Sequence, residues 1–444
     1  MRGRLPGAND VGVSPSAWRA EDRERHLSSH RRGGRVGAVV ERRVPRWSEF
    51  SELIRPRRLT GDATDRRLAR AATIPDLREI ARRTVPRAVF DYTDGAAGAE
   101  ISYRRSREAF ERVEFCPSVL RDVSAVDPST SVLGARSALP LVLAPTGFTR
   151  LMHTEGEPAV ARVAEQAGLV YGLSTMGTTS PEALAAAAPG GRRWFQLYLW
   201  RDREASEQVV ERARAAGFEA LVLTVDTPVA GPRLRDVRNG FTIPPALTLR
   251  TVANAARHPR WWLDQLTTEP LEFAALSSWG GTIGELVDKV FEPAATIADV
   301  DRLRADWPGK LVVKGVQTVD DAVAVVDRGA DAVVVSNHGG RQLDRAPTPL
   351  EVLPDVVAAV GDRAEVYLDG GILDGADVVA AVAFGARACL VGRAYLYGLM
   401  AGGEKGVQRV ADLLDAEIRR TLQLLGVPSL AELTPDRVRL RPPR

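Results

Sequence analysis

Eight short apolar segments, each followed by a helical stretch, constrain the fold of this chain more than any other feature. Most of the segments are rich in Val and Leu and have the length of buried strands, whereas the stretches between them have the Ala- and Val-rich pattern of helices that pack on a sheet. Strands that alternate with helices predict a parallel sheet, and eight is the number that closes a (β/α)8 barrel. The predicted strands are 140–144, 169–173, 194–198, 220–225, 311–314, 332–336, 365–369 and 388–392, and the clearest helices between them are 157–167, 204–216, 319–329 and 376–385.

The N-terminal end differs in composition from the rest of the chain. Residues 1–70 contain 17 Arg against 9 Asp and Glu, although the whole 444-residue chain has a net charge of only +3. An end rich in Arg, Gly, Pro and Ser without hydrophobic periodicity is typical of solvated disorder, which we expect in preference to nucleic-acid binding. We predict a disordered basic tail over 1–43. A start codon placed too far upstream in the gene would also explain the lack of folded pattern in these residues. An N-terminal extension over 44–70 and a barrel domain over 71–444, beginning with a capped amphipathic helix at 74–83, would follow.

The composition excludes several classes of protein. The two cysteines, Cys116 and Cys389, form no C-x-x-C pair, so we expect no disulfide framework, no metal site and a reducing compartment. No apolar run approaches the roughly 18 residues of a membrane-spanning helix, and no signal peptide is apparent. No G-x-G-x-x-G follows an early strand, which argues against a dinucleotide-binding fold. We therefore expect a cytoplasmic enzyme.

Polar side chains end or follow every predicted strand. In a (β/α)8 barrel the carboxyl ends of the strands meet at one mouth, where active sites lie. One polar residue at such an end would mean little, but eight consecutive strand ends are difficult to explain by packing. The sequence therefore predicts an active site at this mouth, built from Pro145 and Thr146, Ser174, Gln196 and Tyr198, Thr224 and Asp226, Lys314, Ser336 and His338, Asp369 with Gly370 and Gly371, and Gly392 with Arg393.

The segment that ends the sixth predicted strand carries the most specific chemistry. It reads Ser-Asn-His-Gly-Gly-Arg-Gln-Leu-Asp over 336–344. His338 and Arg341 are three residues apart on a glycine-rich turn, so they can face one small substrate together. The histidine can transfer a proton and the arginine can bind a carboxylate. A structural histidine in a turn is the alternative, but the pair favours chemistry at the carbon next to a carboxylate.

Lysine is rare in this chain. Only four of the 60 basic side chains are Lys, and one of them, Lys314, ends the fifth predicted strand. A compact ammonium at this position favours a point-charge role that a planar guanidinium could not fill. An ordinary surface lysine at a strand end is an equally good interpretation of the pattern alone.

One connection is unusually long, because residues 231–297 separate the fourth and fifth predicted strands. Loops of more than about 15 residues usually carry function. This one contains a basic-aromatic cluster over 257–263, Arg-His-Pro-Arg-Trp-Trp-Leu. We expect either a lid over the site or a peripheral anchor at the inner face of the cell membrane. Packing of Trp261 and Trp262 against the side of the barrel is at least as good an explanation.

The segment 336–342 resembles the active-site signature of the FMN-dependent L-2-hydroxy acid oxidising enzymes, and the resemblance extends over about 74–433. Three further segments, 144–150, 235–240 and 392–397, are similar in sequence to the actinobacterial L-lactate dehydrogenases of that family. The resemblance implies non-covalently bound FMN and oxidation of an L-2-hydroxy acid, above all L-lactate to pyruvate, with a quinone or a cytochrome as electron acceptor. It also implies a homo-oligomer, often a tetramer.

The resemblance assigns the substrate half of the site. It implies that His338 is the catalytic base and that Asp226 stabilises the imidazolium formed when the proton is taken. Guanidinium forks suit a carboxylate, and phenol hydroxyls suit the other substrate oxygens. The remaining implied substrate ligands are the arginines Arg233 and Arg341 and the tyrosines Tyr92 and Tyr198.

The resemblance also assigns the cofactor half. Lys314 would lie beside the flavin N1 atom, where a fixed positive charge stabilises reduced flavin, and Asp369 would contact the ribityl chain. The residues implied around the flavin ring are Pro145, Thr146, Gly147, Ser174, Gln196, Thr224 and Ser336. The implied phosphate cradle, after the last two strands, is Gly370, Gly371, Gly392 and Arg393.

Two positions depart from the family pattern. Many members have an arginine two residues after Asp-Gly-Gly that touches the phosphate, whereas this chain has Leu373, so FMN would be held with one charge fewer. Members that resemble glycolate oxidase have a tryptophan at the position of Met176. The flexible thioether reshapes the pocket near the substrate side chain and favours lactate over glycolate.

Other functions share parts of this interpretation. An O2-using L-lactate oxidase or monooxygenase, or an oxidase of another 2-hydroxy acid, would have the same fold and residues. An FMN-barrel isomerase, or an enzyme like IMP dehydrogenase with a loop cysteine, is more distant, since neither Cys116 nor Cys389 lies on a suitable loop. A non-catalytic flavin binder would not need the substrate ligands named above.

Overall fold

The computed structural model describes residues 46, 61–240, 256–274 and 291–442. The chain divides into two units, 1–58 and 59–444. The predicted tail over 1–43 and most of the predicted extension over 44–70 lie outside the described residues. The described end of the extension contains helix α2 (Ala63–Leu68), which begins at a capping box formed by Asp62 and Asp65.

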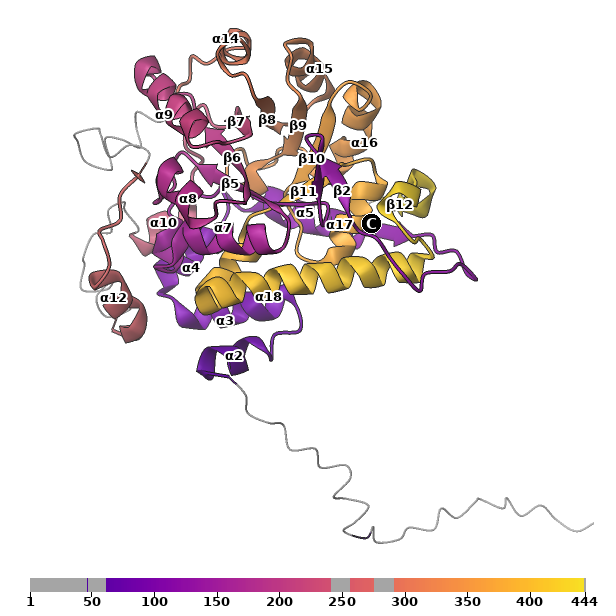
Figure 1. Cartoon of the computed structure of the whole chain (residues 1–444), viewed down its shortest axis with the longest axis horizontal. Helices are drawn as coiled ribbons and strands as arrows, with labels where there is room; N and C mark the ends of the chain where they lie inside the picture. Colours follow the sequence, from indigo (N-terminus) through magenta and orange to yellow (C-terminus); the bar gives the residue numbers. More distant parts are fainter. Residues whose placement is uncertain (1–45, 47–60, 241–255, 275–290, 443–444) are drawn as a thin grey trace, which may run out of the picture. The chain divides into compact units, whose positions relative to one another are not determined.

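Eight parallel strands form a closed barrel in the order β10-β11-β4-β5-β6-β7-β8-β9 (Figure 1). All eight predicted strands are confirmed, and helices cover the barrel, so the (β/α)8 fold expected from the sequence is confirmed. The strands are β4 (Leu141–Leu143), β5 (Val170–Ser174), β6 (Arg192–Leu197), β7 (Ala220–Thr224), β8 (Lys310–Val316), β9 (Ala332–Ser336), β10 (Glu365–Asp369) and β11 (Ala388–Val391). The helices that alternate with them include α7 (Gly156–Gln166), α8 (Pro181–Ala187), α9 (Arg203–Ala215), α14 (Ala298–Asp306), α15 (Val319–Asp327), α16 (Pro349–Val360) and α17 (Gly375–Ala383).

Side chains fill the barrel interior in a cluster separate from the packing between strands and helices. Its largest members are Trp194 and Tyr367, whose ring centroids are 5.7 Å apart. Alanine, valine and leucine fill the space around these rings, which makes the interior a packed core. The smaller members, from the strands and from the residue after β4, are Val142, Ala144, Val170, Ala220, Val222, Val312, Ala332, Val334, Ala388 and Leu390.

A hairpin closes the N-terminal end of the barrel. It consists of β2 (Thr130–Val132) and β3 (Ala135–Ser137), and it places Val132 in the interior cluster. The backbone N–H of Leu133 donates a hydrogen bond of 3.0 Å to Glu365 at the start of β10. The functional cavity lies at the other end of the strands.

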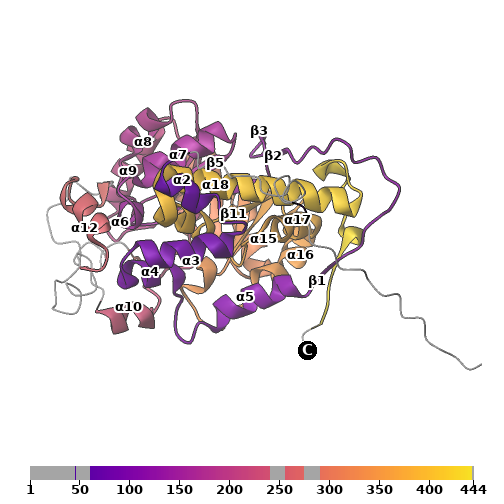
Figure 2. The ribbon, with the colours of Figure 1, turned by 90° about the horizontal axis from the view of Figure 1, so that it is seen from below.

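The helices that precede the barrel are α3 (Ile74–Thr84), α4 (Arg87–Asp94) and α5 (Ile101–Glu111). The amphipathic helix predicted over 74–83 is α3, which packs along the long helix α18 (Arg393–Leu425) (Figure 2). Because α18 follows β11 directly, its N-terminus faces the C-terminal end of the barrel. Near the end of the chain, β12 (Val438–Leu440) pairs with β1 (Val113–Phe115).

The long connection predicted over 231–297 is described in part, since 241–255 and 275–290 lie outside the described residues. Its described parts contain α10 (Leu234–Asn239) and α12 (Pro259–Leu266). Three parts of this connection are therefore described together with the barrel. They are its start, α12 and the residues from 291 onward.

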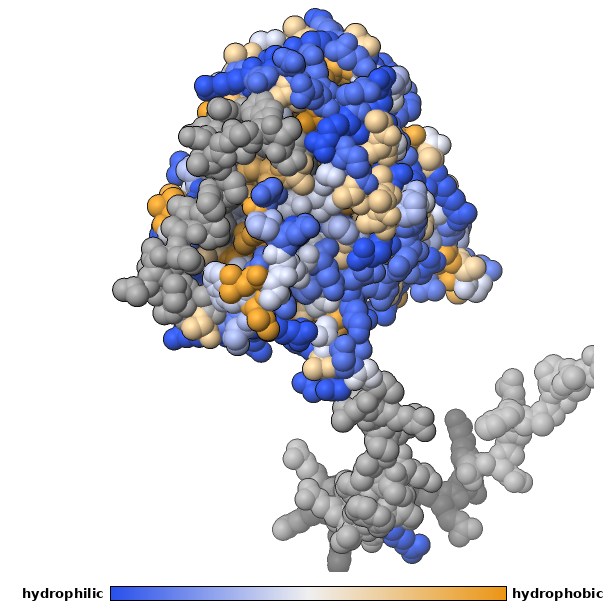
Figure 3. Space-filling view, turned by 60° about the vertical axis from the view of Figure 1, so that its left-hand side comes forward, coloured by the Kyte–Doolittle hydropathy of each residue, from blue (hydrophilic) through white to orange (hydrophobic). Residues whose placement is uncertain are grey.

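Helix α12 packs against the short helix α6 (Thr149–Met152). The indole N–H of Trp261 donates a hydrogen bond of 3.2 Å to the carbonyl of Leu151. Trp261 and Trp262 are both half-buried, whereas Leu263 and Leu266 are 63% and 75% exposed. Figure 3 turns this side of the molecule forward and shows apolar side chains at the surface among polar ones. The exposed apolar face of α12 thus consists of leucines. Among the described ranges, no helix has the length and apolar character needed to cross a membrane.

Candidate active site

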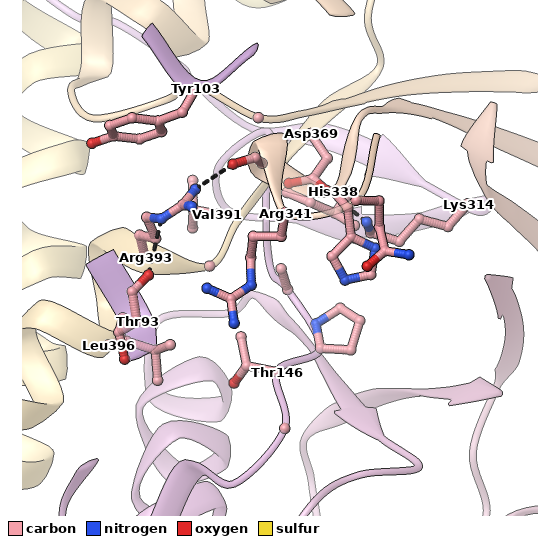
Figure 4. Close-up of a pocket in the computed structure, with 18 of the residues that line it drawn as sticks. Thr93, Tyr103, Thr146, Lys314, His338, Arg341, Asp369, Val391, Arg393 and Leu396 are labelled. Carbon is pink, nitrogen blue, oxygen red and sulfur yellow. Dashed lines mark hydrogen bonds and ion pairs between the residues drawn. The ribbon is translucent and has the colours of Figure 1, made fainter. Parts of the chain in front are cut away.

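One cavity at the C-terminal end of the barrel brings most of the predicted site residues together (Figure 4). Its wall combines strand ends with residues of α4, α5, the start of α10 and the N-terminus of α18. The predicted residues that line it are Tyr92, Pro145, Thr146, Gly147, Tyr198, Arg233, Lys314, His338, Arg341, Asp369, Gly370, Gly371, Gly392 and Arg393. The side chains of the other five, Ser174, Gln196, Thr224, Asp226 and Ser336, are buried behind this wall.

Three buried polar residues at adjacent strand ends form a hydrogen-bonded row. The hydroxyl of Ser174 donates to Oε1 of Gln196 at 2.8 Å, and Nε2 of Gln196 donates to the hydroxyl of Thr224 at 2.9 Å. These bonds fix the orientation of the Gln196 amide. Buried polar groups are costly unless they are hydrogen-bonded, so the row fixes the positions of three polar side chains directly behind the cavity wall.

Lys314 forms an ion pair with Asp369 across the intervening strand. Its Nζ lies 2.6 Å from Oδ2 of Asp369 and donates to Ser336 at 3.1 Å, and Ser336 donates to Asp369 at 2.7 Å. Burial disfavours the ammonium, but the carboxylates of Asp369 and Asp226 outweigh burial and raise the pKa of Lys314 above its ordinary value. Lys314 is only 4% exposed, so the interpretation as an ordinary surface lysine is wrong.

His338 and Asp226 form a hydrogen-bonded pair at the cavity. Nδ1 of His338 lies 3.0 Å from Oδ1 of Asp226, whose side chain is 2% exposed. The carboxylate favours a proton on Nδ1, which leaves the lone pair of Nε2 available. His338 has a left-handed backbone with φ of +57°, an unfavourable conformation for a residue with a side chain, and this conformation is typical of functional turns.

Gly315 provides the space that Asp226 occupies. It has φ of +104°, and a Cβ there would lie 2.7 to 2.9 Å from atoms of Asp226. Only glycine avoids both the strain and the collision. The amide of Gln342 holds the same loop by donating to the carbonyls of Asp226 at 3.1 Å and Val229 at 2.9 Å. The signature segment therefore positions both members of the His338–Asp226 pair.

Two guanidinium groups converge on the ring of Tyr92. The Cζ atoms of Arg233 and Arg341 lie 5.4 Å and 5.1 Å from its centroid. Arg341 donates to the carbonyls of Tyr92 at 2.6 Å and Gly95 at 3.2 Å. Burial, followed by the charge of Arg233, lowers the pKa of Arg341 to about 10. Two half-buried cations on the same ring repel each other, so the cavity favours an anion that lies between them.

Arg233 is held by a residue of its own helix. Asp236 accepts a hydrogen bond of 2.9 Å from Nε of Arg233 and is buried. Neighbouring Arg235 points elsewhere and pairs with Asp94 at 2.8 Å and Glu100 at 2.6 Å. The structure thus separates two arginines that the sequence pattern alone could confuse: Arg233 lines the cavity, and Arg235 attaches α10 to the helices that precede the barrel.

Aromatic and apolar side chains form another wall. Tyr198 lies edge to face with Phe291, with ring centroids 5.7 Å apart. Met176, two residues after Ser174 in the chain, also lines the cavity. Burial, reinforced by Asp226, raises the pKa of Tyr198 above its ordinary value, so its hydroxyl stays protonated and can donate a hydrogen bond. This wall gives the cavity an apolar side next to the His338–Asp226 pair.

The loop after β10 forms the remaining wall. Gly370 and Gly371 have φ of +110° and +84°, and a Cβ on Gly371 would lie 2.8 Å from the carbonyl of Ser106 on α5. These glycines keep the backbone of the loop close to α5 and uncovered by side chains, as a phosphate cradle requires. Arg393 stacks on Tyr103, with 4.7 Å between Cζ and the ring centroid.

Four residues of this site were not predicted from the sequence: Tyr103, Arg107, Asp236 and Phe291. Asp236 could have been found from its helical spacing to Arg233. Tyr103 and Arg107 lie one turn apart on α5, and Phe291 lies beside a segment whose sequence has no periodicity.

A sequence profile of the family described as FMN-dependent dehydrogenase matches residues 81–440. The chain belongs to this family. Its cofactor is therefore FMN, and the protein is an oxidoreductase that acts on a 2-hydroxy acid. The cavity fits this cofactor. The hydrogen-bonded row that contains Gln196 and the buried Lys314 provide polar groups for a flavin ring, and the loop at Gly371 has no room for a Cβ, as expected of a phosphate-binding loop.

Relatives of this chain support the assignment. Over 400 residues, which cover 90% of this chain and 97% of the relative, it is 57% identical to the "Putative L-lactate dehydrogenase" of Mycobacterium tuberculosis. It is 42% identical to the L-lactate dehydrogenase of Caulobacter vibrioides, with coverage of 83% and 98%, and 42% identical to the L-lactate oxidase of Nostoc sp., with coverage of 80% and 94%. The solved structure of the monotopic membrane protein (S)-mandelate dehydrogenase is similar with a TM-score of 0.81 and 38% identity, covering 84% of this chain and 100% of that chain.

Proposed function

We propose that the protein oxidises L-lactate to pyruvate and transfers the electrons to a quinone or a cytochrome. The observation that carries this proposal is the placement of the His338–Asp226 pair in one cavity with Arg233 and Arg341. A base next to a carboxylate-binding pair suits a small 2-hydroxy acid, whose reacting carbon is bonded to the carboxylate. The identity of 57% to the mycobacterial relative supports lactate within that class.

His338 is the base in this proposal. Its Nε2 takes one proton from the substrate, from either the hydroxyl or the Cα atom, and the same residue serves both routes. The imidazolium that forms is stabilised by the Asp226 carboxylate at 3.0 Å, which also keeps the ring in the orientation needed for transfer. Tyr198, which is protonated and partly buried, donates a hydrogen bond to a substrate oxygen and supports the orientation.

Arg341 and Arg233 bind the substrate carboxylate. The anion would relieve the repulsion between the two guanidiniums, and bidentate bonds would fix the acid in one orientation. Tyr92 lies beneath both groups and holds their positions through cation–π contacts. Substrate binding and orientation therefore depend on residues of three separate segments, α4, the start of α10 and the signature turn.

Bound FMN supplies the two-electron acceptor of the reaction. We infer that Lys314 places its positive charge beside the ring, that Asp369 holds the ribityl chain, and that Lys314 and Asp369 keep each other ionised through their contact of 2.6 Å. The residues assigned to the ring are Pro145, Thr146, Gly147, Ser174, Gln196, Thr224 and Ser336, and those assigned to the phosphate are Gly370, Gly371, Gly392 and Arg393.

The apolar wall favours a short substrate side chain. Met176, Tyr198 and Phe291 occupy the side of the cavity next to the reacting position. A methyl group gains from burial against such a wall, whereas glycolate has no side chain to bury and a large ring must displace these residues. Lactate is therefore the better substrate in this proposal.

We infer peripheral contact with the inner face of an anionic membrane through α12. Leu263 and Leu266 are exposed on this helix, and Arg257 and Arg260 lie next to them in the chain. Exposed leucines beside arginines are the pattern of an interfacial helix. A membrane position would bring the enzyme to a quinone pool, and the similarity to the monotopic membrane protein (S)-mandelate dehydrogenase supports this arrangement.

We also infer a homo-oligomer, with a tetramer as the expected state. Sedimentation equilibrium of the purified protein checks this directly, because the monomer mass is 48.1 kDa. A species of monomer mass at micromolar concentration would contradict it.

The experiment that tests the proposal follows product and acceptor together. The purified holoenzyme is given L-lactate with a soluble quinone, with cytochrome c, or with O2 alone, and pyruvate and hydrogen peroxide are measured. We expect pyruvate in proportion to reduced quinone or cytochrome and little peroxide. Fast peroxide formation would instead assign an L-lactate oxidase, as in the Nostoc relative. Turnover of mandelate or glycolate above that of lactate would overturn the substrate assignment.

A further inference from the structure

The cations of the cavity are distributed unevenly over its walls. Among the described residues, most of the arginine and lysine side chains that line it already have partners away from the loop after β10. Lys314 pairs with Asp369, Arg233 pairs with Asp236, and Arg341 donates to backbone carbonyls.

Arg393, the arginine expected in the phosphate cradle, is also engaged. Its Nε, Nη1 and Nη2 atoms donate to the carbonyls of Thr93 at 3.0 Å, Gly339 at 2.8 Å and Gly95 at 2.8 Å. Figure 4 shows the guanidinium turned toward Thr93 and the signature turn. Three of its five N–H groups are thus committed to carbonyls, so this side chain connects the substrate loops and its orientation is fixed by them.

Arg107 is the remaining cation, and it lies against the glycine loop. It projects from α5 into the cavity wall, where Nη1 donates to the carbonyl of Gly371 and to the carboxylate of Asp377. Within the described part of the chain, Nε and Nη2 have no hydrogen-bond partner. Arg107 therefore presents two unused donors and a positive charge at the loop where Leu373 replaces the arginine of many relatives.

Asp377 holds this guanidinium from behind. It accepts hydrogen bonds from the backbone N–H groups of Leu373 at 2.8 Å and Asp374 at 3.2 Å, and its side chain is 7% exposed against 22% for Arg107. Arg107 lines the cavity and Asp377 does not. The carboxylate thus fixes the arginine against the loop without facing an anion in the cavity.

We propose that Arg107 binds the phosphate group of FMN and supplies the side-chain charge that Leu373 cannot. A guanidinium with two parallel donors suits a phosphate, and it acts together with the backbone N–H groups at the N-terminus of α18. Cofactor binding then depends on α5, a helix outside the (β/α)8 repeat. This inference rests on FMN binding and not on the substrate proposed above.

The test compares FMN with riboflavin, which lacks the phosphate. Apoprotein of the full chain is titrated with each flavin, and the dissociation constants are obtained from flavin fluorescence. Arg107→Gln should weaken FMN binding by about 10- to 100-fold, the effect of one charge-assisted hydrogen-bonding group, and leave riboflavin binding within about 2-fold. The matched control is Arg104→Gln on the same helix, where the arginine is exposed and donates to Ala99, and it should change neither constant.

Equal weakening of FMN and riboflavin would overturn the proposal, because it would assign Arg107 a structural role only. Unchanged binding of both would also overturn it. Since removing Arg107 leaves the buried Asp377 carboxylate unpaired, the same comparison is made between Asp377→Asn and the double variant Arg107→Gln/Asp377→Asn. The ratio of the FMN and riboflavin constants should change only in the double variant, and an equal ratio in both would contradict the assignment. A wild-type protein that binds FMN but does not turn over lactate would contradict only the proposed substrate and would leave the role of Arg107 to the flavin titrations.

Discussion

Nδ1 of His338 lies 3.0 Å from Oδ1 of Asp226, and the aspartate side chain is almost fully buried. A neutral imidazole beside this carboxylate carries its proton on Nδ1 and keeps Nε2 free to act as a base. The two residues come from different loops, after β7 and β9. Their contact depends on the space that Gly315 leaves on β8, the strand between them.

Substitution Asp226→Asn should lower kcat by about 10²- to 10⁴-fold, because an amide that donates to Nδ1 forces the proton onto Nε2 and removes the base. FMN content should not change, since Asp226 lies behind the cavity wall. Steady-state turnover and the flavin absorbance per protein check both expectations. A variant with full turnover would show that the carboxylate does not set the tautomer.

Substitution Arg341→Lys should raise KM and lower kcat/KM for L-lactate by about 10- to 100-fold, because an ammonium cannot form the bidentate contact. The control is Arg345→Lys, an exposed arginine just beyond the signature segment, which should behave as wild type. Kinetics of both variants over a range of L-lactate concentrations give the comparison. Equal KM values in the two variants would remove Arg341 from the carboxylate site.

Substitution Lys314→Met should destabilise the FMN-free protein by about 3–5 kcal/mol at neutral pH, because it leaves the buried Asp369 carboxylate unpaired. The control Lys310→Met removes a half-exposed lysine from the same strand, paired with Asp331 at 2.8 Å, and should cost about 0–1 kcal/mol. Urea unfolding of the three proteins gives the free energies.

The same pair predicts a pH dependence. Burial alone would raise the pKa of Asp369, but Lys314 outweighs it and holds the pKa below the ordinary carboxyl value. In the wild type, the contribution of ionised Asp369 to the free energy of unfolding is therefore fully present when the pH is above the ordinary carboxyl pKa. It is lost as the pH falls through the lowered pKa of the folded protein. In Lys314→Met the charge that outweighs burial is lost, and only the Ser336 hydrogen bond and His338 still oppose burial. The pKa of Asp369 should therefore rise, so the deficit relative to wild type should shrink as pH falls toward about 4. A deficit independent of pH would show that the charge of Asp369 is not the cause.

The double substitution Leu263→Ser/Leu266→Ser should reduce co-sedimentation with anionic phospholipid vesicles and leave turnover of soluble acceptors unchanged. The apolar face of α12 would lose its contribution to insertion, whereas the active site lies elsewhere. The control is Leu424→Ser, since Leu424 is 73% exposed on α18. Equal sedimentation of wild type and the double variant would contradict membrane contact through α12.

The barrel and most of the site were predictable because most strands are short apolar runs with a polar residue at or just after their C-terminal end. This local pattern places residues as distant as Thr146 and Asp369 at one end of the barrel. The ion pair between Lys314 and Asp369 was not predictable, because it joins strands that are separated by β9 and depends on side-chain direction. The position of Arg107 depends equally on how α5 packs against the loop after β10.

The exposed face of α12 shows the same limit. The sequence drew attention to Trp261 and Trp262, since aromatic residues beside arginines indicate an interface. Which side of a short helix faces solvent is decided by its partner, and here Trp261 donates to Leu151 of α6. The exposed side chains are consequently Leu263 and Leu266. A periodicity argument over eight residues cannot determine this orientation without the partner helix.

The most direct test of the central claim is anaerobic mixing of the yellow holoenzyme with L-lactate in a stopped-flow spectrophotometer, for the wild type and for His338→Gln. We predict that L-lactate, but not D-lactate, bleaches the flavin absorbance of the wild type. We also predict that the variant retains FMN but is bleached at least about 10²-fold more slowly, because it lacks the base. Bleaching of His338→Gln at the wild-type rate would contradict the assignment of His338 and with it the proposed reaction at this site.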